Sequence, residues 1–439
     1  MSSQESSQES SRVSSHVYSE KHKLTLLLHC GEGTTADLLK FLFTDPSMVK
    51  HKKKIVVRYD NTTGFYTIHA HCDFIYLKVK KSGYIFPRGF FVAIVDGKVE
   101  TIVAFYPKFE NIKDDDFDKF IDETGKKVCI SMKVSGTLAL VTVRVGADGQ
   151  LGIDCTTKKS SSDNDYNTSA KDILLKSLGD KTHKFMQWIY DNKLSLSFEF
   201  ASPDPIHGEH GSKIKEAHVV LIGIFDKKAG RHLTYAEIED MLKEFSEINM
   251  VNYIKVDATK ENIEKIQNFF NATKSSTSHT YTDIEGGLRK IFQGQEVYVG
   301  GNHDYLGKYG SMLEGLIIST EDFSLLAKMK YLAYVGNTML MRYFFSVILN
   351  RERRYKPGVR LDTDHEIVPE IVPEIVPIED KDIKAKVKHL FKNFGYEGEE
   401  YYIKYVIEWV RYLQNKRDQL GPNSSYLDEL ELYKTMMPY

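Results

Sequence analysis

The segment Val128-Cys129-Ile130-Ser131-Met132-Lys133-Val134-Ser135-Gly136-Thr137-Leu138 places one lysine between two apolar stretches. The apolar residues before Lys133 and the run 138–145 predict strands on both sides. A lysine at a strand edge inside a covered pocket loses its proton more readily, and its free amine can attack the α-phosphorus of a nucleotide. Gly136 would let the backbone approach a phosphate. An exposed lysine in a hairpin explains the same pattern, so the segment alone leaves both interpretations open.

The pattern of β-branched and aromatic runs continues on both sides of this segment. Strands are predicted at 55–57, 65–68, 90–95, 99–103, 138–145, 194–200, 219–224 and 316–319. Asp96-Gly97 is a strong hairpin signal, and residues 147–149 indicate a second hairpin. Helical periodicity is found at 170–190, 235–245 and 262–272. We therefore expect an α+β fold with a mixed, largely antiparallel sheet and flanking helices.

The two ends of the chain differ from this central part. Residues 1–20 repeat Ser, Gln and Glu, which predicts a disordered tail. Residues 366–377 read Glu-Ile-Val-Pro three times, so 346–379 is predicted to be a stiff, extended linker. A peptide motif for a partner domain is the alternative for these repeats. Residues 380–439 have helical periodicity and predict a small all-helical C-terminal domain.

Composition restricts the function classes. The formal net charge of −2 over 439 residues means that any nucleic-acid surface must be a local basic face. The four cysteines are scattered without a CxxC pair, which argues against a zinc site or a disulfide framework. His207, His210 and His218 lack metal-ligand spacing, and we expect them to face solvent. No GxxxxGK[ST] segment is found. The chain has no signal-peptide pattern and no apolar run long enough to span a bilayer, so we expect a soluble, cytoplasmic protein.

Six segments, in a fixed order, resemble a known family. They are 87–92 (Pro-Arg-Gly-Phe-Phe-Val), 106–111 (Tyr-Pro-Lys-Phe-Glu-Asn), 133–138 (Lys-Val-Ser-Gly-Thr-Leu), 196–203 (Leu-Ser-Phe-Glu-Phe-Ala-Ser-Pro), 313–318 (Leu-Glu-Gly-Leu-Ile-Ile) and 326–331 (Leu-Ala-Lys-Met-Lys-Tyr). The series resembles the covalent nucleotidyltransferase superfamily, and within it the RNA ligases of the phage T4 RNA ligase 1 type. The resemblance covers roughly residues 50–335. It implies that 21–345 form an ATP-grasp-like adenylyltransferase domain.

The resemblance also implies roles for single residues. Lys133 matches the lysine that becomes adenylylated, and Glu314 matches a carboxylate that helps to position metal. Lys328 and Lys330 occupy alternate strand positions, so both ammonium groups can point to one face. The implied nucleotide-binding residues are Tyr59, Arg88, Lys108, Glu199, Lys328 and Lys330. Two positions depart from the family pattern, because Ser135 stands where Asp or Asn is usual and Phe225 where a polar or basic residue is often found.

The implied activity is an RNA ligase that uses ATP and Mg²⁺. It would join an RNA 5′-phosphate to a 3′-hydroxyl through a lysyl-AMP intermediate and an adenylylated RNA end, with cleaved tRNA as one candidate substrate. No membrane is implied as a partner, and the oligomeric state stays open. The alternatives are a divergent, non-catalytic RNA-binding relative, and a DNA ligase or capping-type nucleotidyltransferase.

Overall fold

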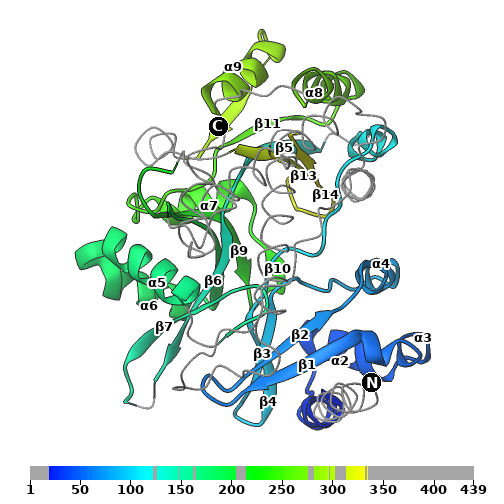
Figure 1. Ribbon diagram of the computed structural model, residues 1–439, viewed down its shortest axis with the longest axis vertical. Coiled ribbons are helices and arrows are strands. Elements are labelled where there is room, and N and C mark those ends of the chain that lie inside the picture. The colour runs from blue at the N-terminus through cyan, green and yellow to red at the C-terminus, as the bar shows by residue number, and fades with distance from the viewer. Residues whose placement is uncertain are drawn as a thin grey trace, which may run out of the picture.

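The computed structural model describes residues 19–121, 126–146, 148–161, 165–203, 214–274, 281–295, 297–301, 313–331 and 334. These residues form three sheets whose paired strands are all antiparallel. Figure 1 shows the three sheets along the long axis, with the N-terminal sheet at the bottom and the β5–β13 sheet at the top. The predicted mixture of helices and largely antiparallel sheets is confirmed. The predicted linker and C-terminal helical domain lie outside the described residues.

The first sheet has the order β1-β2-β3-β4. Its strands are β1 (Ile55–Asp60), β2 (Phe65–Ala70), β3 (Phe90–Val95) and β4 (Lys98–Val103). Asp96 and Gly97 join β3 to β4 with φ of 49° and 76°, so the predicted hairpin is confirmed. Residues 19–28 are helical, and further helices are α2 (Thr34–Thr44), α3 (Pro46–Val49) and α4 (Asp73–Lys81). These elements share a core of their own.

The second sheet has the order β10-β9-β8-β6-β7. Its strands are β6 (Thr137–Val145), β7 (Leu151–Thr156), β8 (Leu194–Ala201), β9 (His218–Asp226) and β10 (Arg231–His232). The single helix predicted at 170–190 is wrong, because the segment is divided into α5 (Asp165–Leu178) and α6 (Thr182–Asp191). Gly179 stands at the break with φ of 53°, a left-handed conformation that ends a helix.

The third sheet has the order β12-β11-β5-β13-β14. Its strands are β5 (Lys127–Val134), β11 (Tyr253–Asp257), β12 (Tyr298–Gly300), β13 (Leu313–Thr320) and β14 (Leu326–Lys330). The helices after β10 are α7 (Tyr235–Leu242), α8 (Lys260–Thr273) and α9 (Tyr281–Ile291). The chain passes from β5 of this sheet to β6 of the second sheet through Ser135 and Gly136 alone. A Cβ on Gly136 would lie 2.6 Å from Glu199 Cγ and from the Phe200 carbonyl oxygen, so this crossing admits only glycine.

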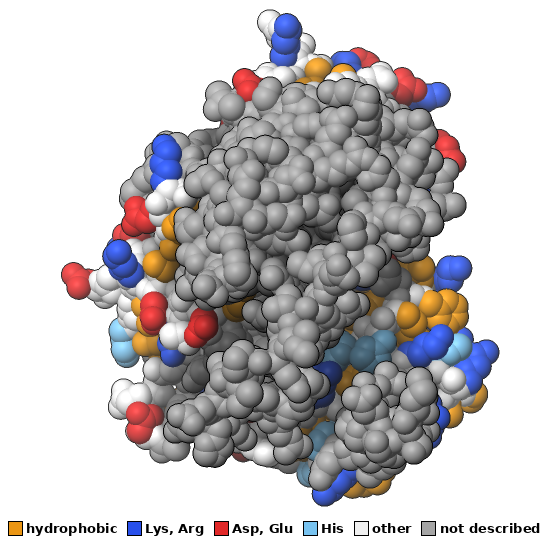
Figure 2. All heavy atoms as spheres, in the orientation of Figure 1, with side chains coloured by type: hydrophobic (Ala, Val, Ile, Leu, Met, Phe, Trp, Pro, Cys, Tyr) orange, Lys and Arg blue, Asp and Glu red, His pale blue; other side chains and the backbone are white. Residues whose placement is uncertain are grey.

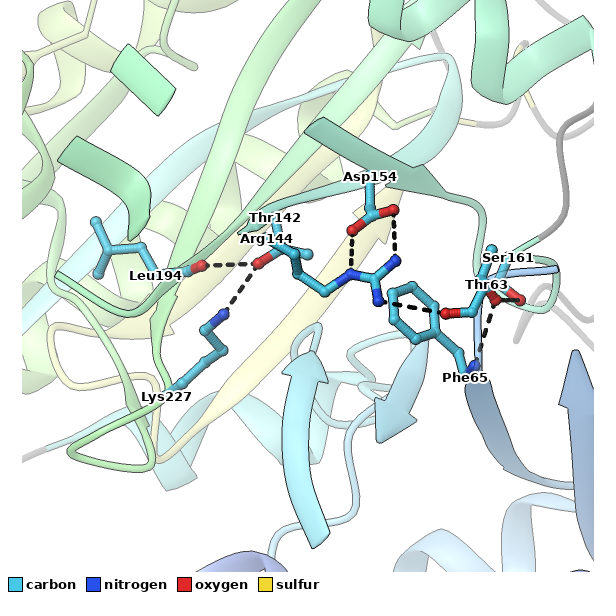
Figure 3. Close-up of polar contacts among 8 residues, drawn as sticks. All are labelled: Thr63, Phe65, Thr142, Arg144, Asp154, Ser161, Leu194 and Lys227. Atoms are coloured by element: carbon cyan, nitrogen blue, oxygen red, sulfur yellow. Dashed lines mark hydrogen bonds and ion pairs between the residues drawn. The ribbon is translucent and has the colours of Figure 1, made fainter. Parts of the chain in front are cut away.

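The first and second sheets are joined through Arg144. Its guanidinium donates to both carboxylate oxygens of Asp154 and to the Thr63 carbonyl oxygen at 3.3 Å. It also lies 4.2 Å from the centroid of the Phe65 ring. Figure 3 shows the guanidinium between the Asp154 carboxylate of β7 and Thr63 in the β1–β2 turn. The pair with Asp154 lies within the second sheet and orients the guanidinium, and the bond to Thr63 and the contact with the Phe65 ring reach the first sheet.

A pocket of about 770 Å³ lies beside this junction, between α2, β4 and β6. Lys227 lines it and donates to Thr142 Oγ1 at 2.9 Å, as Figure 3 shows. Burial, followed by the charge of Lys193, lowers the pKa of Lys227 to about 8.

Two expectations at the level of boundaries and exposure are corrected. His218 is buried at the start of β9 and does not face solvent, while His207 and His210 lie outside the described residues. Residues 19 and 20, which were predicted to belong to the tail, are helical, and Ser19 is buried and accepts a hydrogen bond from the Val57 amide. No described helix has the length and apolar character that a membrane crossing requires.

Candidate active site

A β-bulge on β13 builds the centre of the site. Gly315 is paired with Lys133 of β5 on one side and with Lys330 of β14 on the other. Directly opposed residues share a face, so both lysines project to the same side of the sheet. Glu314 would point to the other side in a regular strand, but it is the extra residue of the bulge between Leu313 and Gly315. Its carboxylate thus reaches both lysines, with Lys133 Nζ at 2.6 Å and Lys330 Nζ on the second oxygen.

Gly315 allows the close pairing of Lys133, Gly315 and Lys330 across the three strands. Its φ is 154°, and a Cβ there would lie 1.8 Å from the carbonyl oxygen of Met329. No side chain can be accommodated without moving β14. Glu314 and Gly315 therefore act together: the glycine allows close contact between strands, and the bulge turns the glutamate towards the lysines.

A second carboxylate comes from the neighbouring sheet. Glu199 lies on β8 opposite Leu138, next to the Ser135-Gly136 crossing, and accepts a hydrogen bond from the Gly136 amide. Burial raises the pKa of Glu199 to about 7, against the opposing influence of Lys133. The crossing thus places a carboxylate from one sheet beside a lysine from the other.

Lys328 adds a third ammonium group to the cluster. It lies two residues before Lys330 on β14, so both project to one face, as predicted. Its Nζ donates to the Phe109 carbonyl oxygen at 3.2 Å and lies 5.5 Å from the Phe109 ring centroid. Burial, then the charges of Lys330, Arg88 and Lys133, lower its pKa to about 8.

The segments that carry Arg88 and Lys108 are attached to β14 by backbone hydrogen bonds. The Arg88 amide donates to the Tyr106 carbonyl at 3.2 Å, and the Phe105 amide donates to the Arg88 carbonyl at 3.0 Å. The Lys328 amide in turn donates to the Glu110 carbonyl at 3.0 Å. Lys108 is mostly buried and forms an ion pair with Glu110 at 2.9 Å. Three of the six sequence segments are thus held side by side.

The protonation state of Lys133 differs from the sequence-based expectation. Burial lowers its pKa, but the charges of Glu314 and Glu199 and the hydrogen bond to Glu314 outweigh burial, so that the pKa is raised. The same pairing, with Lys133 and Lys330, overcomes burial and lowers the pKa of Glu314 to about 2. The unliganded site therefore holds Lys133 as an ammonium ion paired with a carboxylate.

Ser135 and Tyr334 form a contact that the sequence did not reveal. Ser135 is fully buried, and its hydroxyl donates to the Tyr334 hydroxyl at 3.3 Å. Lys330 Nζ lies 5.2 Å from the Tyr334 ring centroid, so this tyrosine borders the lysine cluster. Tyr334 lies only four residues beyond Lys330, but tyrosine is common in cores and gave no signal by itself.

Tyr59 is placed apart from the other predicted residues. It lies on β1 of the first sheet, is 40 % exposed, and its ring contacts His22 and Tyr66. None of its described contacts is with the lysine cluster. The nucleotide contact of Tyr59 stays a prediction.

The donor set suits a polyphosphate and a hard cation. Lys133, Lys328 and Lys330 can offset the charge of phosphate oxygens, and Arg88 lies close enough to influence the pKa of two of them. Glu199 and Glu314 provide carboxylate oxygens, the ligands that Mg²⁺ prefers. No group of three or more His, Cys, Asp or Glu that could hold a metal occurs among the described residues. A magnesium ion at this site would thus take further ligands from phosphate and water, as is usual for this ion.

Three antiparallel sheets with a lysine cluster at the crossing between two of them form a site suited to the phosphates of a nucleotide. Comparison with known protein families identifies the family of this chain. The family described as RNA ligase, of the T4 RNA ligase 1 type, matches residues 87–345, more than half of the chain. The chain belongs to this RNA ligase family, and the resemblance inferred from the six segments is confirmed.

The solved structures that resemble the chain are distant. An archaeal ATP-dependent RNA ligase is 12% identical with a TM-score of 0.45, covering 85% of this chain and 81% of that one. A Naegleria gruberi RNA ligase with ATP and Mn is 14% identical with a TM-score of 0.35, covering 52% and 56%. A putative ATP-dependent DNA ligase from Aquifex aeolicus is 13% identical with a TM-score of 0.37, covering 88% and 76%. No curated protein matches the chain. No activity follows from likenesses this remote.

Proposed function

We propose that this chain is an ATP-dependent RNA ligase that works through adenylylated Lys133. The observation that carries the proposal is the placement of Lys133 within one ion-paired cluster with Glu314 and Lys330, beside Glu199 and Lys328. Family membership supplies RNA as the substrate class. One of the similar structures is described as an archaeal ATP-dependent RNA ligase, and another is a Naegleria gruberi RNA ligase mutant with ATP and Mn.

The first step transfers AMP to the enzyme. The free amine of Lys133 attacks the α-phosphorus of ATP, the bond between the α-phosphorus and the bridging oxygen breaks, and pyrophosphate leaves. Lys328 and Lys330 offset the charge that develops on the phosphate oxygens. Magnesium, when bound through Glu199 or Glu314, supplies further neutralisation of phosphate charge. Lys133 must lose a proton first, so its ion pair with Glu314 has to be weakened when the nucleotide binds.

The next two steps join the RNA ends. A 5′-phosphate oxygen of RNA attacks the phosphorus of lysyl-AMP, which releases Lys133 and forms an adenylylated 5′ end. A 3′-hydroxyl then attacks the RNA 5′-phosphorus, the phosphodiester forms, and AMP leaves with the electron pair of the broken bond. A cleaved tRNA is one substrate that presents both ends.

Labelling with nucleotide tests this proposal. Incubation with α-³²P-ATP and Mg²⁺ is expected to leave label on denatured wild-type protein, and Lys133→Ala is expected to lose it. Lys255→Ala, which removes a lysine of the same sheet outside the cluster, should keep the label. Equal labelling of wild type and Lys133→Ala would refute the proposal.

The alternatives give different results in the same assay. Label from GTP in place of ATP would indicate a capping-type enzyme, and sealing of nicked DNA but not RNA would indicate a DNA ligase. Absence of label with retained RNA affinity would indicate a non-catalytic relative. Defined nicked and single-stranded RNAs would then identify the preferred ends.

A further inference from the structure

A dense basic patch lies on the first sheet's helical side. It consists of seven lysines from the segment after α3 and from the last turns of α4: Lys50, Lys52, Lys53, Lys54, Lys78, Lys80 and Lys81. Six of them are exposed and Lys78 is half-buried. Figure 2 shows Lys and Arg side chains with hydrophobic ones gathered at the lower right, where Figure 1 places α3 and α4. We call this surface the α3–α4 patch.

The charges of the α3–α4 patch outnumber the acids described near them, since Glu20 pairs with Lys52 and Asp45 lies close enough to Lys78 for the lysine to help lower the pKa of Asp45. Within the described part of the chain, Lys52 alone of the seven is in an ion pair, with Glu20 at 3.8 Å. His51 lies among them, and desolvation, then Lys78, Lys54 and Lys50, lower its pKa. The whole chain has a net charge of −2, so this excess is local. Unpaired like charges repel one another, which makes the surface suited to a polyanion.

An exposed aromatic ring lies within the α3–α4 patch. Phe74 is 50% exposed, its ring centroid is 5.1 Å from that of His51, and Lys54 Nζ lies 5.8 Å from it. Leu77 and Ile85 are exposed nearby in sequence. Lysines around a bare aromatic ring are the combination that binds single-stranded nucleic acid, because the backbone meets the charges and an unpaired base stacks on the ring.

The α3–α4 patch is connected to the lysine cluster by a short piece of chain. Arg88 is the seventh residue after Lys81, so their Cα atoms lie within about 25 Å of each other. Arg88 in turn is close enough to lower the pKa of Lys133. The patch itself precedes residue 87, where the family match begins. It is therefore a feature of this chain outside the matched region.

We propose that the α3–α4 patch binds single-stranded RNA several nucleotides away from the end that reacts at Lys133. This proposal rests on RNA being the substrate class of the proposed function. The lysines contact successive phosphates, and the Phe74 ring stacks with one base. The patch thereby contributes affinity for longer RNA without taking part in the chemistry.

Binding of labelled RNA with 5′-hydroxyl ends, measured without ATP, tests the proposal. For a 20-nucleotide single strand, Lys53→Gln/Lys54→Gln/Lys80→Gln is expected to raise Kd about tenfold. The slope of log K against log salt should fall by about 2 for three lost phosphate contacts. Lys176→Gln/Lys228→Gln/Lys290→Gln removes the same charge from exposed lysines elsewhere and should change Kd less than twofold. For a 4-nucleotide RNA both triple variants should bind like wild type.

A second variant tests whether the α3–α4 patch binds single-stranded RNA in preference to other polyanions. Phe74→Leu keeps an apolar side chain, and it should weaken binding of the single strand several-fold while leaving duplex RNA unchanged. Equal Kd values for the two triple variants would overturn the proposal. The proposal would also be overturned if Lys53→Gln/Lys54→Gln/Lys80→Gln lost binding to phosphatidylserine vesicles but bound RNA as tightly as wild type. Both triple variants should label Lys133 normally with ATP, so a failure of labelling in wild type would count against the proposed function and not against the patch.

Discussion

The ion pair between Lys133 and Glu314 sets the resting state of the candidate nucleophile. Because Glu314 raises the pKa of Lys133, the fraction of free amine at neutral pH is small and increases with pH. Glu314→Gln removes the negative charge, so the pKa of Lys133 should fall. The pH profile of single-turnover labelling is then expected to shift to lower pH, even where the maximal rate is reduced.

Glu110→Gln is the matched control for this profile, since Glu110 pairs with Lys108 and not with Lys133. Its profile should coincide with that of wild type. A Glu314→Gln profile that also coincides with wild type would show that Glu314 does not control the proton on Lys133.

Single residues show where inference from the sequence succeeds and where it stops. Lys133, Lys328 and Lys330 were placed together correctly because segment order and strand alternation are visible in the sequence. The protonation state of Lys133 was predicted wrongly, since it depends on the carboxylate of Glu314, which is 181 residues away and is turned towards Lys133 by a bulge. The hydrogen bond between Ser135 and Tyr334 was not predicted either, because the contact is formed only by the packed chain.

At the scale of elements, the bulge on β13 is the most sensitive feature of the site. Gly315→Ala would place a Cβ 1.8 Å from a backbone oxygen of β14, which cannot move without breaking the pairing. We expect a loss of more than about 2 kcal/mol in the free energy of unfolding, with loss of Lys133 labelling. Urea denaturation would measure the loss.

Gly286→Ala provides the control, because this glycine lies in α9 with no atom near the added methyl. It should leave labelling unchanged and increase stability by up to about 1 kcal/mol. A Gly315→Ala protein as stable and as readily labelled as wild type would show that β14 is free to shift.

Strands were more predictable than helices. The Asp96-Gly97 hairpin follows from two residues whose backbone conformation is nearly obligatory. The break at Gly179 and the helices α2 and α4 were not predicted, because their periodicity is short and is stabilised by packing on the first sheet. The division of the strands into three sheets depends on the Ser135-Gly136 crossing, where close packing and not a local signal requires the glycine.

At the scale of the whole molecule, Arg144 couples the first sheet to the catalytic part. Arg144→Met should lower the free energy of unfolding by about 1–3 kcal/mol, because the Asp154 carboxylate loses its partner. Cleavage by a protease within the first sheet should become faster. Arg289→Met removes an exposed helical ion pair with Glu285 and should cost less than about 1 kcal/mol. Equal protease resistance in the two variants would argue against a coupling role for Arg144.

The pKa order of the lysines affects how chemical probes will respond to this protein. General electrophiles such as activated esters acylate only a neutral amine, whatever its role in the reaction. Lys227 and Lys328, with pKa near 8, are partly neutral at pH 7.5, whereas Lys133 is held as an ammonium ion. Peptide mass spectrometry after such treatment is expected to find more modification at Lys227 and Lys328 than at Lys133. A survey of hyper-reactive lysines is therefore expected to miss Lys133, the residue that we propose reacts with ATP, and a probe that carries the nucleotide is expected to label it.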